Sequence, residues 1–162
     1  HTETYPALSD DATLVAFNES DCKGPPTPNQ YYGTSPCDGY DDPSAALKLV
    51  SSKGGTAVAL ANANGTETWT NSWPRFSPKH GSFRGKSIYW LTFSSRRPYG
   101  IVSKGSTTGT SKPQIWFAAV LVDGDGTTLS GDPSAPPFRM SGQDVEIGNH
   151  IPQWVEKVVA PH

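Results

Sequence analysis

The chain has 162 residues, of which 17% are charged, and its formal net charge is −2. A nucleic-acid or polyanion binder would carry a basic stripe, and this composition argues against one. The 16 glycines and 15 prolines lie between short apolar runs, which is typical of a turn-rich β protein. No apolar run nears the roughly 18 residues of a membrane span. The sequence contains no signal peptide, so we expect it to be the mature form or an excised fragment if the protein is exported.

The N-terminal region predicts two antiparallel strands, residues 5–9 and 13–17, joined by a tight turn at Asp10-Asp11. In the second of these strands apolar side chains point to both faces. Pro6 lies near the start of the first strand, where its missing N–H is tolerated. These residues begin a first structural unit, which we assign to residues 1–70.

Residues 19–43 form an irregular loop that contains both cysteines, Cys22 and Cys37, fifteen residues apart. A disulfide between them would constrain the unfolded chain by about 3 kcal/mol, and it would indicate an oxidising compartment, periplasmic or extracellular. Two unrelated free thiols are the alternative. A zinc site is not expected, because two cysteines without nearby histidines do not complete four ligands. Tyr31 and Tyr32 in this loop are candidates for contact with a partner.

The rest of the chain continues as short strands of period two, and no helix is expected. A second hairpin turns at Gly54-Gly55. Beyond a polar connection, the run from Trp73 to Pro78 begins a second unit, residues 71–148, and an insertion separates it from the next strand. The expected strands after the first hairpin are residues 46–50, 56–60, 73–78, 87–93, 114–122 and 137–140.

The spacing of these runs indicates a repeat. Pro74 follows Pro6 by 68 residues, and Ile115 follows Leu47 by the same 68. Residues 149–154 then copy the pattern of residues 71–76, so 149–162 begin a third, partial unit as its first strand or a closing strand. We therefore predict an all-β fold of four-stranded antiparallel propeller blades, two repeats of 68 residues and part of a third.

The segment Tyr5-Pro6-Ala7-Leu8-Ser9-Asp10-Asp11-Ala12-Thr13-Leu14-Val15-Ala16-Phe17 resembles the TolB-like (WD-repeat-like) β-propeller repeat, in outline aromatic-Pro-x-aromatic-Ser-Pro-Asp-Gly-x-x-apolar-Ala-Phe. Residues 73–78 with 88–95 are a closer match. The chain departs from the pattern at Asp10-Asp11-Ala12, where the repeat has Pro-Asp-Gly, and at the insertion 78–86. The resemblance implies a propeller fold, and family members in envelope and secreted bacterial proteins mostly act in protein contacts.

Two blades do not close a ring. The chain is then either part of a larger propeller or one subunit of an oligomer, in which three chains would supply roughly six blades. The partial third unit could complete a sheet in its own chain or in a neighbour, because an unpaired edge strand is an aggregation risk.

Metal-binding candidates are few. His1 could chelate copper through its amine and ring, as in copper-dependent polysaccharide monooxygenases; a cleavage boundary is the alternative reading. Asp123 and Asp125 lie in a Asp-Gly-Asp-Gly turn that resembles a calcium loop, but the position where an EF-hand needs an acidic ligand is Ser134. Asp132 could still contribute to an irregular calcium site. No cofactor is expected otherwise.

Catalytic motifs are lacking: the chain has no Gly-x-Ser-x-Gly elbow and no Ser-His-Asp set of known order. Trp69 lies in a polar connection and could stack on a sugar or a peptide, whereas the other tryptophans are expected in cores. Arg96 and Arg97 could contact an acidic partner at a rim, or form internal or solvated contacts. Asn18 and Asn64 begin glycosylation sequons that matter only in a eukaryotic secretory route.

These features predict an exported, non-enzymatic propeller module that binds a protein partner or self-associates. The alternatives are a carbohydrate-binding, lectin-like oligomeric propeller and a propeller domain cut from a secreted hydrolase, besides the copper enzyme that His1 would suggest. Nucleic acid and a membrane span are not expected.

Overall fold

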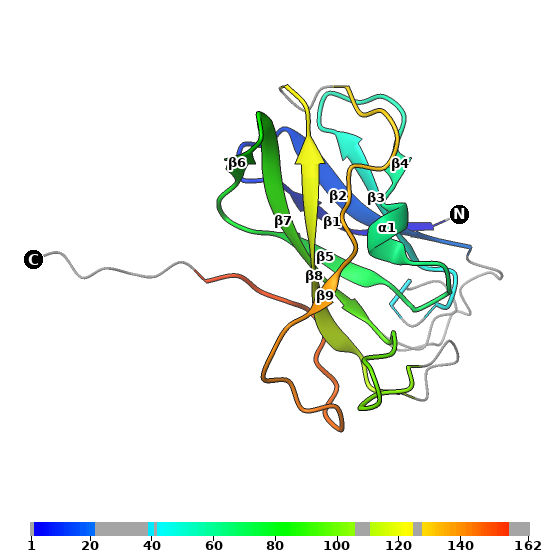
Figure 1. The fold of residues 1–162 in the computed structure, drawn as a ribbon. Helices are drawn as coiled ribbons and strands as arrows, with labels where there is room; N and C mark the ends of the chain where they lie inside the picture. Colours follow the sequence, from blue (N-terminus) through cyan, green and yellow to red (C-terminus); the bar gives the residue numbers. More distant parts are fainter. Residues whose placement is uncertain (1, 22–38, 41, 106–110, 125–127, 156–162) are drawn as a thin grey trace, which may run out of the picture.

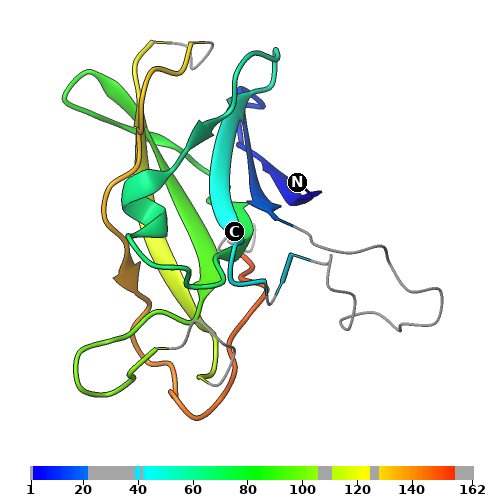
Figure 2. The same ribbon diagram turned by 90° about the vertical axis from the view of Figure 1, so that its right-hand side faces the viewer.

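A computed structural model of the protein describes residues 2–21, 39–40, 42–105, 111–124 and 128–155. In these residues the chain forms two antiparallel sheets that lie face to face as two layers (Figures 1 and 2). The prediction of an all-β fold with antiparallel sheets is confirmed. No helix in the described ranges has the length and apolar character to cross a bilayer.

The first sheet contains four strands in the order of the chain: β1 (Thr2–Leu8), β2 (Leu14–Ser20), β3 (Ala46–Ser51) and β4 (Val58–Ala59). Alternation along β2 buries Leu14 and Ala16 on the face turned to the second sheet. β2 extends to Ser20, so the strand enters the segment predicted as the cysteine loop. The extension follows from pairing on both sides, since Glu19 is opposite Glu3 and Ala46.

The second sheet contains β5 (Ser72–Phe76), β7 (Lys86–Ser95), β8 (Gln114–Val122) and β9 (Phe138–Arg139) in this spatial order, with β6 (Gly81–Phe83) paired to the start of β7. The strand β6 was predicted as part of a loop. It forms because Arg84 and Gly85 both adopt positive φ, 50° and 79°, which suits a two-residue hairpin turn.

A single helical turn, α1 (Ala61–Asn64), contradicts the expectation of no helix. Side chains of the segment that follows β8 accept hydrogen bonds from its first N–H groups. Asn62 N donates to Asp132 Oδ2 over 2.6 Å, and Ala63 N donates to Ser134 Oγ over 3.0 Å. Unpaired N–H groups at a helix start require such acceptors. Because these acceptors lie about 70 residues away, no local pattern predicts the turn.

The core lies between the two layers. The first sheet and α1 contribute mainly aliphatic side chains, and the second sheet contributes aromatic and aliphatic ones, with Phe93 and Leu91 fully buried. Each such side chain stabilises the fold by about 1.5–3 kcal/mol on burial. The core residues are Ala7, Leu14, Ala16, Leu47, Leu49, Leu60, Ala63, Phe76, Tyr89, Leu91, Phe93, Trp116, Ala118, Val120 and Val122.

A backbone irregularity occurs three times. Tyr5, Trp73 and Ile151 have φ of 55°, 55° and 58°, and each directly precedes a proline. In β1 and β5 this residue lies in a bulge, where the pairing register with the neighbouring strand shifts. Positive φ is uncommon for residues with a side chain. The three sites therefore share one unusual conformation.

Candidate interaction surface

The strand registers define equivalent positions in the two sheets. One cross-strand row runs Ala7, Ala16, Leu49, Val58 in the first sheet, and a second runs Arg75, Thr92, Phe117, Phe138 in the second sheet. The rows cross their sheets in the same strand order, and their members on the first and third strands are each 68 residues apart. Members of the first row belong to the core between the sheets. The second row lies on the opposite, outer side of the molecule.

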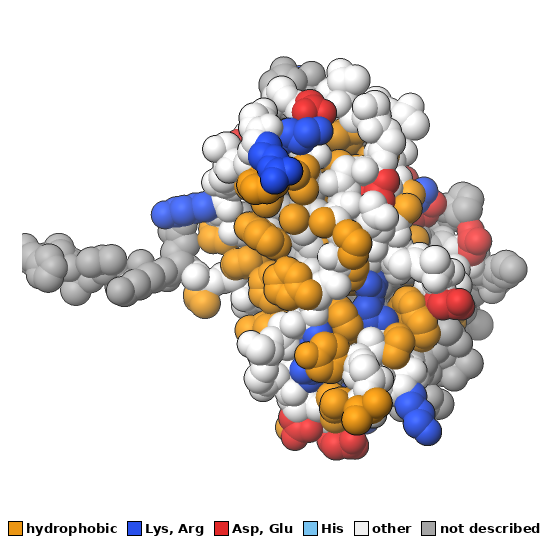
Figure 3. Space-filling view, viewed as in Figure 1, with side chains coloured by type: hydrophobic (Ala, Val, Ile, Leu, Met, Phe, Trp, Pro, Cys, Tyr) orange, Lys and Arg blue, Asp and Glu red, His pale blue; other side chains and the backbone are white. Residues whose placement is uncertain are grey.

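The outer side of the second sheet is apolar, and we call it the free face. Phe138 is 52% exposed and Trp90 is 37% exposed. The Phe138 ring stacks on Phe117 with centroids 5.4 Å apart and meets Trp90 edge-on at 6.1 Å. Figure 3 shows hydrophobic side chains gathered over β7, β8 and β9 on this side. The free face comprises Ile88, Trp90, Thr92, Ile115, Phe117, Ala119, Leu121 and Phe138.

The C-terminal segment, residues 149–155, crosses one end of the free face. Trp154 Nε1 donates to Thr92 Oγ1 over 3.0 Å and to the Arg75 carbonyl over 3.3 Å, and its ring meets Phe117 edge-on at 5.5 Å. Trp154 follows Pro152 by two residues, as Phe76 follows Pro74. Phe76 packs into the core against the first sheet. Trp154 thus covers the free face as Phe76 covers the corresponding face of the first sheet.

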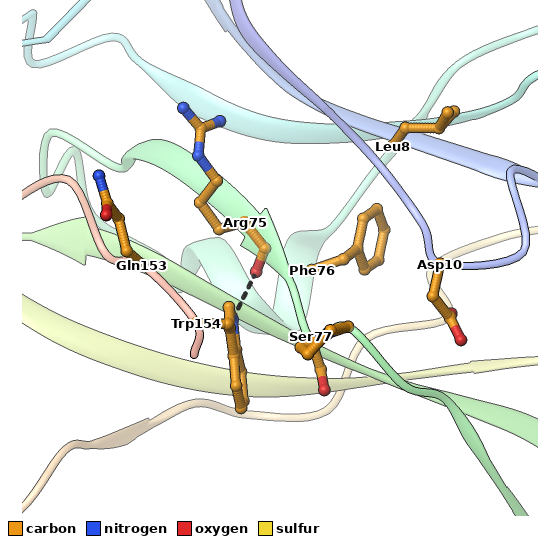
Figure 4. A pocket seen from close by; sticks show the side chains of 8 residues that line it. Leu8, Asp10, Arg75, Phe76, Ser77, Gln153 and Trp154 are labelled. Atoms are coloured by element: carbon orange, nitrogen blue, oxygen red, sulfur yellow. Dashed lines mark hydrogen bonds between the residues drawn. The ribbon is translucent and has the colours of Figure 1, made fainter. Parts of the chain in front are cut away.

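A hollow of about 390 Å³ opens between β5, the end of β1 and this segment. Figure 4 shows Arg75 directed toward the side of Gln153, with Asp10 at the opposite end. Its walls combine apolar side chains with the charged ends of Arg75 and Asp10. The lining residues are Leu8, Asp10, Arg75, Phe76, Ser77, Pro78, Gln153 and Trp154.

Polar contacts join the Asp10-Asp11 turn to the second sheet. His80 Nδ1 lies 2.9 Å from Asp10 Oδ2, and the Tyr89 hydroxyl donates to Asp11 Oδ2 over 2.7 Å. Burial favours a higher pKa for Asp11, but hydrogen bonds from Ser9, Tyr89 and Thr13 outweigh it and lower the pKa to about 2. Burial, with the Asp11 carboxylate beside it, raises the pKa of Tyr89.

The same turn brings possible metal ligands together. Ligand atoms of Asp10, Asp11 and His80 lie within 4.8 Å of one another. Hydrogen bonds already engage both Asp11 oxygens, and His80 Nδ1 is directed to Asp10. Through these contacts the three side chains link the Asp10-Asp11 turn to the second sheet.

Arg97 is buried, so of the contacts considered for it an internal one is found and not a contact at a rim. Burial lowers its pKa to about 10. Its guanidinium lies 5.1 Å from the centroids of Phe93 and Trp116 and donates to the Ala63 carbonyl and to Asn71 Oδ1 over 2.7 and 2.8 Å. Arg96 is 8% exposed and donates to the Ser111 carbonyl. Both cations therefore hold loops and α1 in place.

The remaining predicted site residues that the structure describes make separate contacts. Trp69 is half-buried, and its carbonyl accepts hydrogen bonds from Arg96 N and Ser95 Oγ. The Asp123 side chain is 79% exposed and pairs with Lys86, whereas Asp132 accepts a hydrogen bond from the start of α1. The predictions for His1, Cys22, Tyr31, Tyr32, Cys37 and Asp125 lie outside the described residues.

The side chains of both sequon asparagines are buried and hydrogen-bonded. Asn18 is fully buried and donates to Thr4 Oγ1 over 2.9 Å. Asn64 Oδ1 accepts from Leu47 N over 2.7 Å, and its amide donates to the Leu47 carbonyl. In the folded chain these side chains fix backbone groups and are closed to a glycosyl donor.

Comparison with known proteins gives no match to any family model, curated protein or solved structure. The free face is an apolar surface on which Trp90 and Phe138 stay exposed in the described part of the chain. Sequence reasoning assigned Trp90 to a core and gave Phe138 no role. The signal was available in the run from Ile88 to Phe93, where large apolar side chains point to both sides of the strand.

Proposed function

We propose that this protein is a non-enzymatic module for protein contacts and that the free face receives a β-sheet of another polypeptide, in the stacked arrangement of propeller blades. The single observation behind the proposal is the equivalence of the two cross-strand rows. Ala16 and Leu49 are buried by a sheet that packs on them, and Thr92 and Phe117 hold the same register positions on the free face. The free face has the same strand register as the covered face of the first sheet, so it is suited to packing against another sheet.

The chemistry of the free face supports this use. Exposed aromatic side chains are rare on surfaces that remain in water, and contiguous apolar patches commonly mark protein contacts. Aromatic pairs add about 0.5–1.5 kcal/mol beyond the area that they bury. The Phe138 ring contacts those of Trp90 and Phe117, so the three rings would present a partner with one aromatic surface.

Export to the periplasm or the cell exterior belongs to this proposal. Its support is the pair of cysteines in a proline-rich segment, because disulfides form in oxidising compartments. The carbohydrate-binding alternative has less support, because the Trp69 ring is half-buried and lies against Gly65, where an added Cβ would be 3.7 Å from the indole.

Site-specific photo-crosslinking tests the proposal. A benzoylphenylalanine replaces Phe138 in one variant and Phe83 in a control, since these residues are 52% and 49% exposed but only Phe138 lies on the free face. Irradiation in the source cells should give one discrete protein adduct from position 138 and none from position 83. Equal adducts from both positions, or none from position 138, would refute the proposal.

A further inference from the structure

Two N–H groups on the core-facing side of the second sheet are buried without an acceptor in the described part of the chain. They are Nε1 of Trp116, a residue that is 5% exposed, and Nε of Arg139. Trp116 and Arg139 are directly opposite each other in the pairing of β8 with β9, so their side chains leave the sheet on the same face. A buried donor is costly to leave unpaired, so two neighbouring ones indicate an acceptor that serves both.

The ring of Tyr99 contacts both donor side chains. It meets the Trp116 ring edge-on, with centroids 6.2 Å apart, and its centroid lies 5.0 Å from Cζ of Arg139. Tyr99 belongs to an ordered turn, in which its N–H donates to the Ser103 carbonyl over 2.8 Å. Tyr99 is 44% exposed and Trp116 only 5%, so the tyrosine is the outer of the two rings. The two donors and this ring therefore define one place at the end of β8.

The same place has an excess of positive charge. The guanidinium of Arg97 lies 5.1 Å from the Trp116 ring centroid, and its acceptors in the described residues are neutral carbonyl, amide and hydroxyl oxygens. Arg139 Nη2 likewise donates to the neutral oxygens Gln114 Oε1 and the Gln143 carbonyl. Neither guanidinium forms an ion pair with a carboxylate of the described residues. Cations removed from water favour a counter-ion, so an anion suits this place better than a neutral acceptor.

The geometry of the donors selects the kind of anion. Carboxylates and other planar oxyanions are bound best by two parallel N–H groups of one guanidinium. Both parallel pairs of a guanidinium include Nη2, and in Arg139 this atom is already engaged by Gln114 and Gln143. Arg139 is left with Nε, and Trp116 adds one N–H from a different side chain. Single donors on separate groups suit a spherical ion, which has no preferred direction of approach.

We infer that Trp116 Nε1 and Arg139 Nε bind a halide ion, such as chloride, against Tyr99 and beside the guanidinium of Arg97. The site lies on the face of β8 opposite to the free face, so it goes beyond the proposed function and does not depend on it. The ion links β9, a strand of two residues, to β8 and to the turn that carries Tyr99. The free energy of unfolding should therefore rise with the halide concentration.

Unfolding in different salts tests the site in solution. The unfolding temperature is measured while sodium chloride replaces sodium gluconate at constant ionic strength, because gluconate is too bulky for a buried place. We expect a rise that saturates with chloride, and the same behaviour with bromide. Trp116→Phe keeps an aromatic ring but removes the N–H, and this variant and Arg139→Gln should each need roughly tenfold more chloride for half of the rise. The matched controls Trp69→Phe and Arg84→Gln should respond like the parent.

A crystal of the parent protein grown with sodium bromide locates the ion without any substitution. We expect an anomalous peak in contact with Trp116 Nε1 and Arg139 Nε. The inference would be overturned by bromide that binds only elsewhere, or by a water molecule or a side chain of the chain itself between these two donors. An equal chloride response of the parent and all the variants, or no response of the parent, would overturn it as well.

Discussion

The rings of Tyr5 and Trp73 stack with centroids 3.9 Å apart and planes inclined by 22°. Each residue is the positive-φ position before a proline, one in β1 and the other in β5. The stack therefore joins the first strands of the two sheets at equivalent points. The strain of two left-handed residues is offset here by direct contact between their side chains.

This contact predicts a measurable coupling. Trp73→Ala should lower the free energy of unfolding by about 2 kcal/mol, and Trp73→Phe by less, because a half-buried ring and its stacking partner are lost. In a double-mutant cycle with Tyr5→Ala, the coupling energy should be about 1 kcal/mol. Urea unfolding followed by circular dichroism measures both. Additive effects of the two variants would show that the stack contributes nothing.

The turn of the first hairpin predicts a stabilising substitution. Ala12 has φ of 59°, which lies in the left-handed region. Ala12→Gly should raise the free energy of unfolding by roughly 1 kcal/mol, because glycine adopts this conformation without a Cβ clash. Ala135→Gly, at a residue without positive φ, is the control and should be neutral or destabilising. A loss of stability in Ala12→Gly would contradict the assignment of strain to this residue.

The hydrogen bonds of Asp11 predict a defined pH dependence of the free energy of unfolding. The pKa of Asp11 falls from 3.8 in the unfolded chain to about 2 in the folded one, so its contribution to stability is present above pH 3.8 and is lost as the pH falls toward 2. Asp11→Asn should be less stable than the parent at neutral pH, and the difference should shrink over that window. Asp123→Asn, at an exposed carboxylate, should show no such convergence in acid titrations of unfolding.

Arg97 is expected to be a stability determinant. Arg97→Met should cost roughly 2–4 kcal/mol, because it removes the Arg97 donor from the Ala63 carbonyl and from Asn71 Oδ1. Arg97→Lys should recover part of this loss, since an ammonium group donates but cannot reproduce the planar fork. The matched control Arg84→Met changes an exposed arginine. An unfolding temperature of Arg97→Met equal to that of the parent would refute the role of Arg97 in stability.

The cysteine pair remains a prediction, and the described residues that flank it favour a bridge. Asp21 N donates to Ser44 Oγ over 2.8 Å, and an added Cβ on Gly39 would lie 3.5 Å from Ser20 Oγ. The residues next to the cysteine segment therefore meet at one end of β2. The intact mass of the protein purified without reductant should be two hydrogen atoms below that of the reduced chain, and an unchanged mass after reduction would contradict the bridge.

Strand periodicity predicted most of the fold. The 114–122 run matches β8 at both ends, and the other predicted strands were correct within a few residues. The misses have physical causes. β6 depends on a turn with a non-glycine residue at positive φ, and α1 depends on acceptors from Asp132 and Ser134 that only tertiary packing brings near.

The candidate surface was harder to predict than the strands. Alternation in β7 shows that Trp90 and Leu91 lie on opposite faces, but not which face another sheet covers. That distinction depends on the stacking order of the sheets. Arg96 and Arg97 show the same limit, because the sequence left contacts at a rim, inside the protein or with solvent open for both. In the structure aromatic rings bury Arg97, and Arg96 donates to the Ser111 carbonyl.

The central claim is that the free face is suited to receive the strands of another sheet. A second copy of residues 10–60 joined directly after Val155 would provide these strands in the register of the first sheet. Hydrogen–deuterium exchange of this extended chain should show protected amides at residues 153–155 and in the added strands, and Trp90 should lose its exposure to fluorescence quenchers. Free exchange at residues 153–155, with both original sheets still protected, would contradict the account.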